Sequence, residues 1–257
     1  MMRLIFSLFL AASVVVPARA QSWNTPIDQD LFQVYDQLKT TLATPEDFAR
    51  RTEELVRAAR ETPPSSRQER RRATITELEA ANLLNDMMEH PVVGLAIEKK
   101  YDPTLRFGFC FGRAAWAHIE LLRRGVAKDS IKKIFVVGPM ASDGLKWQFH
   151  VAAMARLPDG DWITIDSDLK KTLRLNEWIR EVNKMSVDGK LAYFVTEPAR
   201  LGASTTVKIN PTMFRHPLND AMYNQYFEDM MAEFRKASKT KAPAPVSCRG
   251  VFSATAP

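Results

Sequence analysis

The chain has 257 residues, 46% of them hydrophobic and 26% charged, and its formal net charge is +6. This balance is that of a globular protein, and the length allows one sizeable domain or a small domain beside a medium one. The basic residues are scattered along the chain instead of forming one stripe, which argues against nucleic acid as the natural partner.

The first twenty residues are predicted to be a secretory signal peptide. Arg3 supplies a positive start, residues 4–16 form an apolar run, and residues 18–20 (Ala-Arg-Ala) form a small-x-small cleavage motif. This run is shorter than the ~20 apolar residues of a spanning helix, and no other run approaches that length. We therefore expect residues 1–20 to be removed from a secreted or periplasmic protein that is not stably inserted in a membrane. The alternative is an uncleaved N-terminal anchor.

Residues 21–72 are predicted to form a helical segment that ends in a basic linker. Apolar residues recur at helical spacing within residues 29–60, and Thr44-Pro45 supplies an N-cap hydroxyl and a proline for the first helical position. Residues 63–66 (Pro-Pro-Ser-Ser) precede a run with four arginines, at 67–72, which is typical of an exposed linker. The alternative for the arginine run is a site for processing proteases.

Residues 73–237 are predicted to be one α+β domain. Helices are expected over residues 76–88, 111–124, 176–182 and 219–237, and strands over residues 131–137, 146–157 and 162–169. The sequence Pro-Asp-Gly-Asp at residues 158–161 predicts a hairpin between the last two strands. A central helix that leads into an antiparallel sheet is typical of the α+β class. Residues 238–257 are predicted to be a flexible tail.

Cys110 is a candidate nucleophile. It lies between Gly108 and Gly112, at or just before the start of the predicted helix 111–124. Unpaired backbone N–H groups and the positive end of the helix dipole favour a thiolate there, and the same N–H groups are suited to hold an oxyanion. One alternative is a buried cysteine that packs as a small hydrophobic residue. Another is a disulfide with Cys248, the default for two cysteines in an exported chain.

A thiol nucleophile needs a base, and His150 is the candidate among the four histidines. His90 and His216 each precede a proline and fit loops or turns. His118 follows Cys110 on the same predicted helix, ~12 Å along its axis, and is too far away to reach it. His150 lies inside the predicted strand 146–157. The alternative for His150 is a strand histidine with a purely structural role.

A carboxylate is needed to orient the imidazole, and the next strand offers Asp166 and Asp168. A strict two-residue turn would put either aspartate on the opposite face from His150, whereas a loop of odd length or a bulge puts them on the same face. One such register places Asp168 directly opposite His150 and Asp166 diagonal to it. Spacing alone leaves both aspartates open.

The segment around Cys110 resembles the transglutaminase-like (papain-like cysteine) superfamily. In that superfamily a cysteine opens a helix that ends at a glycine and is followed by a strand, as in the run from Gly108 through Cys110 to Gly125. The block from His150 through the turn at residues 158–161 and Trp162 is similar to the histidine-to-aspartate block of the same superfamily. The resemblance implies a core in which the helix that carries the nucleophile packs against an antiparallel sheet.

The order Cys, His, Asp is also that of the superfamily, and it implies a catalytic triad of Cys110, His150 and Asp166. Ser167 stands where the superfamily usually has a proline. By this resemblance Asp166 orients the histidine and Asp168 is a strand-end residue. We expect Asp166 to accept the Nδ1 proton of His150 and Nε2 to face Cys110.

Within the superfamily, residues 110–114 (Cys-Phe-Gly-Arg-Ala) and 147–152 (Trp-Gln-Phe-His-Val-Ala) look most like bacterial protein glutaminases, which deamidate glutamine side chains of proteins. The resemblance covers about residues 107–178. It implies a hydrolase that acts on proteins or peptides with exposed glutamine and uses no cofactor and no metal. Those enzymes are exported with a pro-region that covers the active site, a role that residues 21–72 would fill.

Three alternatives stay open at this point. A transglutaminase would use the same triad but accept an amine in place of water, and a cysteine protease would accept a backbone amide. The third is a catalytically silent binding module in which Cys110 and Cys248 form a disulfide. The sequence leaves the oligomeric state open.

Overall fold

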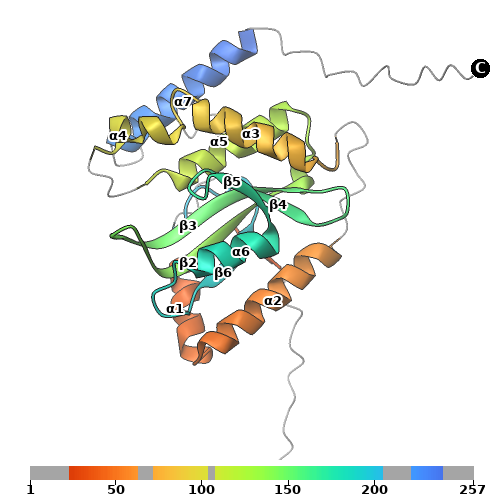
Figure 1. Cartoon of the computed structure of the whole chain (residues 1–257), viewed down its shortest axis with the longest axis vertical. Coiled ribbons are helices and arrows are strands. Elements are labelled where there is room, and N and C mark those ends of the chain that lie inside the picture. The colour runs from red at the N-terminus through yellow and green to blue at the C-terminus, as the bar shows by residue number, and fades with distance from the viewer. Residues whose placement is uncertain (1–22, 63–71, 104–107, 205–220, 240–257) are drawn as a thin grey trace, which may run out of the picture.

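The computed structural model describes residues 23–62, 72–103, 108–204 and 221–239 (Figure 1). The predicted signal peptide, most of the basic linker and nearly all of the predicted tail, with Cys248, lie outside these residues. Within the described part of the chain, no helix is both long enough and apolar enough to cross a membrane.

A six-stranded sheet lies at the middle of the described structure, in the order β1-β6-β2-β3-β4-β5. Its strands are β1 (Asn24–Thr25), β2 (Ile131–Ser142), β3 (Leu145–Arg156), β4 (Trp162–Asp166), β5 (Lys171–Arg174) and β6 (Ala192–Thr196). Neighbouring strands are antiparallel except for β1 and β6, which pair in parallel. The predicted α+β class is confirmed, although β1, β5 and β6 were not predicted.

Helices cover both faces of the sheet (Figure 1). They are α1 (Leu31–Thr41), α2 (Pro45–Glu61), α3 (Glu77–Glu89), α4 (Glu98–Tyr101), α5 (Cys110–Arg123), α6 (Leu175–Asn183) and α7 (Ala221–Lys239), with short 3-10 turns at Leu95–Ile97 and Lys128–Ser130. Thr44 and Thr76 cap α2 and α3 through reciprocal hydrogen bonds with the residue three positions later. These caps explain why the predicted helix boundaries nearby are accurate.

Two hydrophobic cores lie on opposite faces of the sheet. Helices α3, α5 and α7 pack on one face, against side chains such as Phe135 and Val151. Helix α6 and the second half of α2 pack on the other face, against Ile134 and Ala152. The alternation of neighbouring strand residues between the two cores follows from the two-residue period of a strand.

Residues 23–62 are packed into this body. Strand β1 extends the sheet at β6, the indole N–H of Trp162 donates to the carbonyl of Ala59 at 3.0 Å, and Arg60 forms an ion pair with Asp161 at 2.7 Å. The role of this segment as a removable pro-region stays a prediction. Its contacts mean that its loss would uncover part of both cores.

The hairpin between β3 and β4 sets the register of the candidate site. Its loop has an odd number of residues, and Ala153 pairs with Ile165. The same register puts Asp166 at the end of β4 diagonal to His150, and, if it continued past the end of β4, it would bring Asp168 to the level of His150. This is one of the registers that the sequence left open.

Candidate active site

Cys110 is the first residue of α5, one position earlier than the predicted helix start. Its thiol is free and 8% exposed. The residue before it, Phe109, stacks on the ring of Tyr226 in α7 with ring centroids 4.3 Å apart. A Cβ on Gly112 would collide with the same tyrosine ring, which explains the glycine. Helix α7 therefore holds the start of α5, and with it the cysteine, in place.

His150 and Asp166 form a buried pair across β3 and β4. Nε2 of His150 lies 2.8 Å from Oδ2 of Asp166. The same oxygen accepts the indole N–H of Trp178 at 2.6 Å, and Oδ1 accepts the backbone N–H of Asp168 at 2.9 Å. Because each oxygen of Asp166 has a donor or an imidazole nitrogen beside it, the carboxylate is fixed in one orientation.

The predicted assignment of the two imidazole nitrogens is wrong. Asp166 faces Nε2. Nδ1 is therefore the ring nitrogen left for the thiol of Cys110, whose hydrogen bond is one of the causes that raise the pKa of His150. The strand register explains why Nε2 and not Nδ1 of His150 faces Asp166. Since Asp166 is diagonal to His150 on the next strand, it is reached by Nε2, the ring nitrogen that lies farther from the backbone.

The charges of this pair shift both pKa values. Burial alone would lower the pKa of His150, but the charge of Asp166 and hydrogen bonds to Asp166 and Cys110 raise it well above its ordinary value. Burial alone would raise the pKa of Asp166, but the charge and hydrogen bond of His150 and the indole of Trp178 lower it. The pair is therefore suited to carry a positive imidazolium beside the thiol of Cys110.

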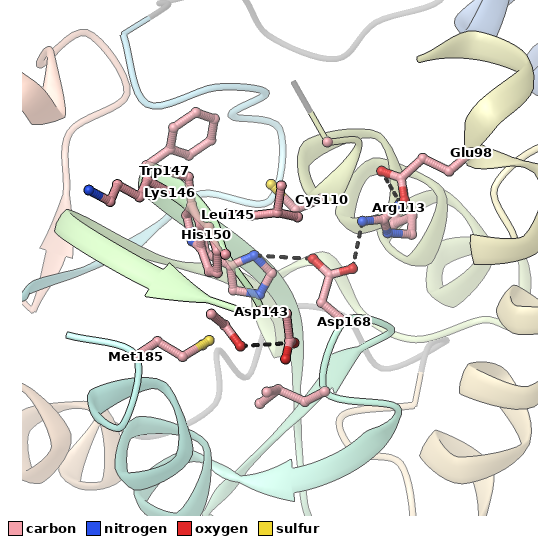
Figure 2. A pocket seen from close by; sticks show the side chains of 15 residues that line it. Glu98, Cys110, Arg113, Asp143, Leu145, Lys146, Trp147, His150, Asp168 and Met185 are labelled. Carbon is pink, nitrogen blue, oxygen red and sulfur yellow. Dashed lines mark hydrogen bonds and ion pairs between the residues drawn. The ribbon is translucent and has the colours of Figure 1, made fainter. Parts of the chain in front are cut away.

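Asp168 lies beside the candidate triad and is not the strand-end residue that the sequence suggested. Strand β4 ends at Asp166 instead of Leu169, because the side chain of Asp166 binds the backbone N–H of residue 168 and turns the chain. Oδ2 of Asp168 is 3.5 Å from Nδ1 of His150. Figure 2 shows its carboxylate between His150 and Arg113.

Arg113 anchors that second carboxylate. It lies one helical turn after Cys110 on α5 and is 4% exposed. Its Nη2 is 2.6 Å from Oδ1 of Asp168, and its Nη1 is 3.4 Å from Oε1 of Glu98. Sequence reasoning did not single out Arg113, although its position three residues after the nucleophile places it on the same side of the helix.

The candidate site opens into a cavity of about 670 Å³. Its described lining comes from the start of α5, the hairpin between β2 and β3, and the turn after β4 (Figure 2). Cys110, His150 and Asp168 lie in its wall, and Trp147 and Leu145 supply apolar surface from the hairpin. No part of residues 23–62 is among these lining residues. The volume falls in the range of small-ligand sites, so a substrate side chain with some flanking backbone fits.

His150, Asp166 and Asp168 are also close enough together to be considered as metal ligands. The two carboxylates, however, lie at different nitrogens of one ring, Asp166 at Nε2 and Asp168 at Nδ1. One imidazole offers only one free nitrogen to an ion at a time, so this geometry fits two carboxylates that each interact with their own ring nitrogen better than a set of converging ligands.

The fold and the site together describe an α+β protein that assembles a cysteine, a histidine and an aspartate at one cavity. No family model matches the chain, and no curated protein does. One solved structure, a mutant of pro-protein-glutaminase, resembles the chain with 17% identity and a TM-score of 0.42. The similarity covers 60% of this chain and 59% of that one, so the chain spans less than two thirds of that structure.

Proposed function

We propose that the protein is an exported, cysteine-dependent hydrolase that deamidates glutamine side chains of proteins or peptides. The observation that carries the proposal is the position of His150 in the wall of an open cavity that Cys110 also lines, with Asp166 at Nε2 and with Cys110 near enough to raise the pKa of the imidazole through a hydrogen bond. A nucleophile, a base within hydrogen-bond reach and a third group that orients the base are the parts that acyl transfer needs.

In the first half of the reaction, Nδ1 of His150 takes the proton of the Cys110 thiol, and the sulfur attacks the carbon of the substrate carboxamide. Backbone N–H groups at the start of α5 stabilise the oxyanion. The C–N bond then breaks as Nδ1 of His150 gives its proton to the nitrogen, and ammonia leaves. A thioester between the glutamyl group and Cys110 remains.

In the second half, water hydrolyses the thioester. Nδ1 of His150 accepts a proton from the water, the new C–O bond forms, and the bond between carbon and the sulfur of Cys110 breaks. The product is a glutamate side chain. Asp166 stays ionised throughout, because its role is to hold the ring through Nε2 and to balance the imidazolium charge.

The choice of glutamine is supported by the sequence. Residues 110–114 and 147–152 resemble the corresponding segments of bacterial protein glutaminases. The predicted signal peptide at residues 1–20 supports a secreted or periplasmic location. The substrates in this proposal are proteins or peptides that expose glutamine outside the cytoplasm.

Ammonia release from a glutamine-rich protein, measured with and without an added primary amine, tests the proposal. We expect ammonia release in both cases, with glutamate as the product. Incorporation of the amine would indicate a transglutaminase, and new peptide N-termini would indicate a protease. No reaction, together with a count of no free thiol in the oxidised protein, would indicate a binding module with a Cys110–Cys248 disulfide.

A further inference from the structure

We propose that Asp168 accepts a hydrogen bond from the leaving nitrogen of the substrate and thereby makes the site selective for carboxamides over esters. The inference rests on the proposed function, in which His150 protonates that nitrogen. It assigns a substrate-binding role to a carboxylate that is not a member of the proposed triad.

The path of the proton determines where the leaving nitrogen lies relative to Asp168. In the proposed reaction Nδ1 of His150 gives its proton to the leaving nitrogen, so that nitrogen must come within hydrogen-bond distance of Nδ1. Oδ2 of Asp168 is already 3.5 Å from Nδ1 and lines the same cavity. A nitrogen at Nδ1 is therefore also within reach of Asp168.

Asp168 is held in place although its side chain is 36% exposed. Its backbone N–H is bound by Oδ1 of Asp166 at 2.9 Å. Its Oδ1 is paired at 2.6 Å with Arg113, a buried guanidinium that also contacts Glu98. The remaining oxygen, Oδ2, is the one that faces His150 and the cavity. Because it belongs to a carboxylate paired with arginine, it acts as a hydrogen-bond acceptor.

An acceptor at this position discriminates between leaving groups. A carboxamide nitrogen carries two N–H donors, and one of them can bind Oδ2 of Asp168 while the nitrogen takes the proton from His150. The C–N bond breaks and ammonia leaves, and no proton is transferred to Asp168. An ester oxygen has no hydrogen to donate, and a carboxylate product is repelled by the negative charge.

The test compares two substrates that differ only in the leaving group, a blocked glutaminyl dipeptide and the γ-methyl ester of its glutamyl counterpart. The ratio kcat/KM for each reports the steps up to acylation. We expect Asp168→Asn to lower kcat/KM for the amide by about 10- to 100-fold, as for loss of a charge-assisted hydrogen bond, and that for the ester by less than about 3-fold.

Asp129→Asn is the matched control. Asp129 is an exposed carboxylate in the turn before β2 and does not line the cavity. This variant is expected to leave both ratios unchanged. Asp168→Ala, which removes the acceptor altogether, is expected to lower kcat/KM for the amide selectively, as Asp168→Asn does. Circular dichroism verifies that each variant is folded.

Two results would overturn the inference. In the first, wild type hydrolyses the amide, but the Asp168 variants show the same fall in kcat/KM for amide and ester, or no fall in kcat/KM for the amide. Asp168 then does not bind the leaving nitrogen, and the proposed function stands. If wild type hydrolyses neither substrate nor any glutamine-rich protein, the proposed function is wrong and the role of Asp168 is overturned with it.

Discussion

The indole N–H of Trp178 donates to Oδ2 of Asp166 at 2.6 Å, on the oxygen that also faces Nε2 of His150. Trp178 is fully buried in α6, and its ring stacks on His150 with centroids 6.0 Å apart. One side chain of α6 therefore fixes both the proposed base and the carboxylate that orients it. Trp178 acts through these two residues and not on the substrate.

Trp178→Phe tests this positioning role. The indole is one of the groups that lower the pKa of Asp166, so its loss raises that pKa. The acid limb of the pH profile of kcat/KM is therefore expected to move to higher pH, with a decrease of about tenfold at neutral pH. The free energy of unfolding at neutral pH should fall by about 1.5–3 kcal/mol, the value of a hydrogen bond to a charged group.

Trp162→Phe is the control for this prediction. Trp162 is equally buried, and its indole donates to a backbone carbonyl, that of Ala59, at 3.0 Å. This variant is expected to lose stability while its pH profile stays that of wild type. An acid limb that does not move in Trp178→Phe would contradict the positioning role.

Asp166→Asn is expected to lower kcat by ~10²–10⁴, because the amide neither balances an imidazolium nor holds the ring in the same way. Asp161→Asn is the control. Asp161 is a buried carboxylate on the same hairpin that pairs with Arg60, so its loss should reduce stability and leave kcat near wild type. Circular dichroism verifies the fold of both variants. An active Asp166→Asn enzyme would remove Asp166 from the proposed triad.

Local signals in the sequence were sufficient for much of the fold. The cap signal Thr44-Pro45 marked the start of α2, apolar spacing placed a helix from residue 76, and the sequence Pro-Asp-Gly-Asp at 158–161 marked the hairpin between β3 and β4. Each of these signals depends on residues at most a few positions apart, so it can be read without the tertiary structure. The structure also brings together His150 and Asp166, a pair that spacing left open and that the resemblance to the transglutaminase-like superfamily singled out.

Contacts between distant parts of the chain could not be read in this way. Strand β1 is only two residues long and is defined by its pairing with β6. The contact between Phe109 and Tyr226 joins α5 to α7. The choice between the two nitrogens of His150 depends on the angle at which neighbouring strands present their side chains, a quantity that residue spacing does not contain.

Lys133 predicts a pH dependence of stability. It is fully buried in β2, where its Nζ donates to the carbonyl of Arg200 at 2.6 Å, and burial lowers its pKa from 10.5 to about 7. Between these two values the unfolded chain holds a proton on Lys133 that the folded chain does not. The free energy of unfolding therefore rises with pH from about 7 upward, by at most about 1.4 kcal/mol per pH unit.

Lys133→Met removes this contribution. Urea unfolding between about pH 7 and pH 9 is expected to show a smaller slope of stability against pH in the variant than in wild type. Lys132→Met is the control, because Lys132 on the same strand pairs with Glu197 at 2.7 Å. A slope in Lys133→Met equal to that of wild type would mean that Lys133 keeps its charge in the folded protein.

Limited trypsin treatment tests the role of residues 23–62. A cut within residues 67–72 is expected to leave the fragment bound under native conditions, because it pairs with β6 and fills part of both cores. Gel filtration of the cut protein should give one peak that contains both pieces, with unchanged activity. Release of the fragment with a rise in activity would instead support the pro-region that the sequence suggested.

The central claim is that Cys110 is the nucleophile. Its most direct test is ammonia release from a glutamine-rich protein by wild type, Cys110→Ala and Cys248→Ala at equal concentrations. We expect Cys248→Ala to match wild type and Cys110→Ala to be at least ~10³-fold slower, as when a nucleophile is removed from a catalytic triad. Ammonia release at the wild-type rate by folded Cys110→Ala would contradict the account.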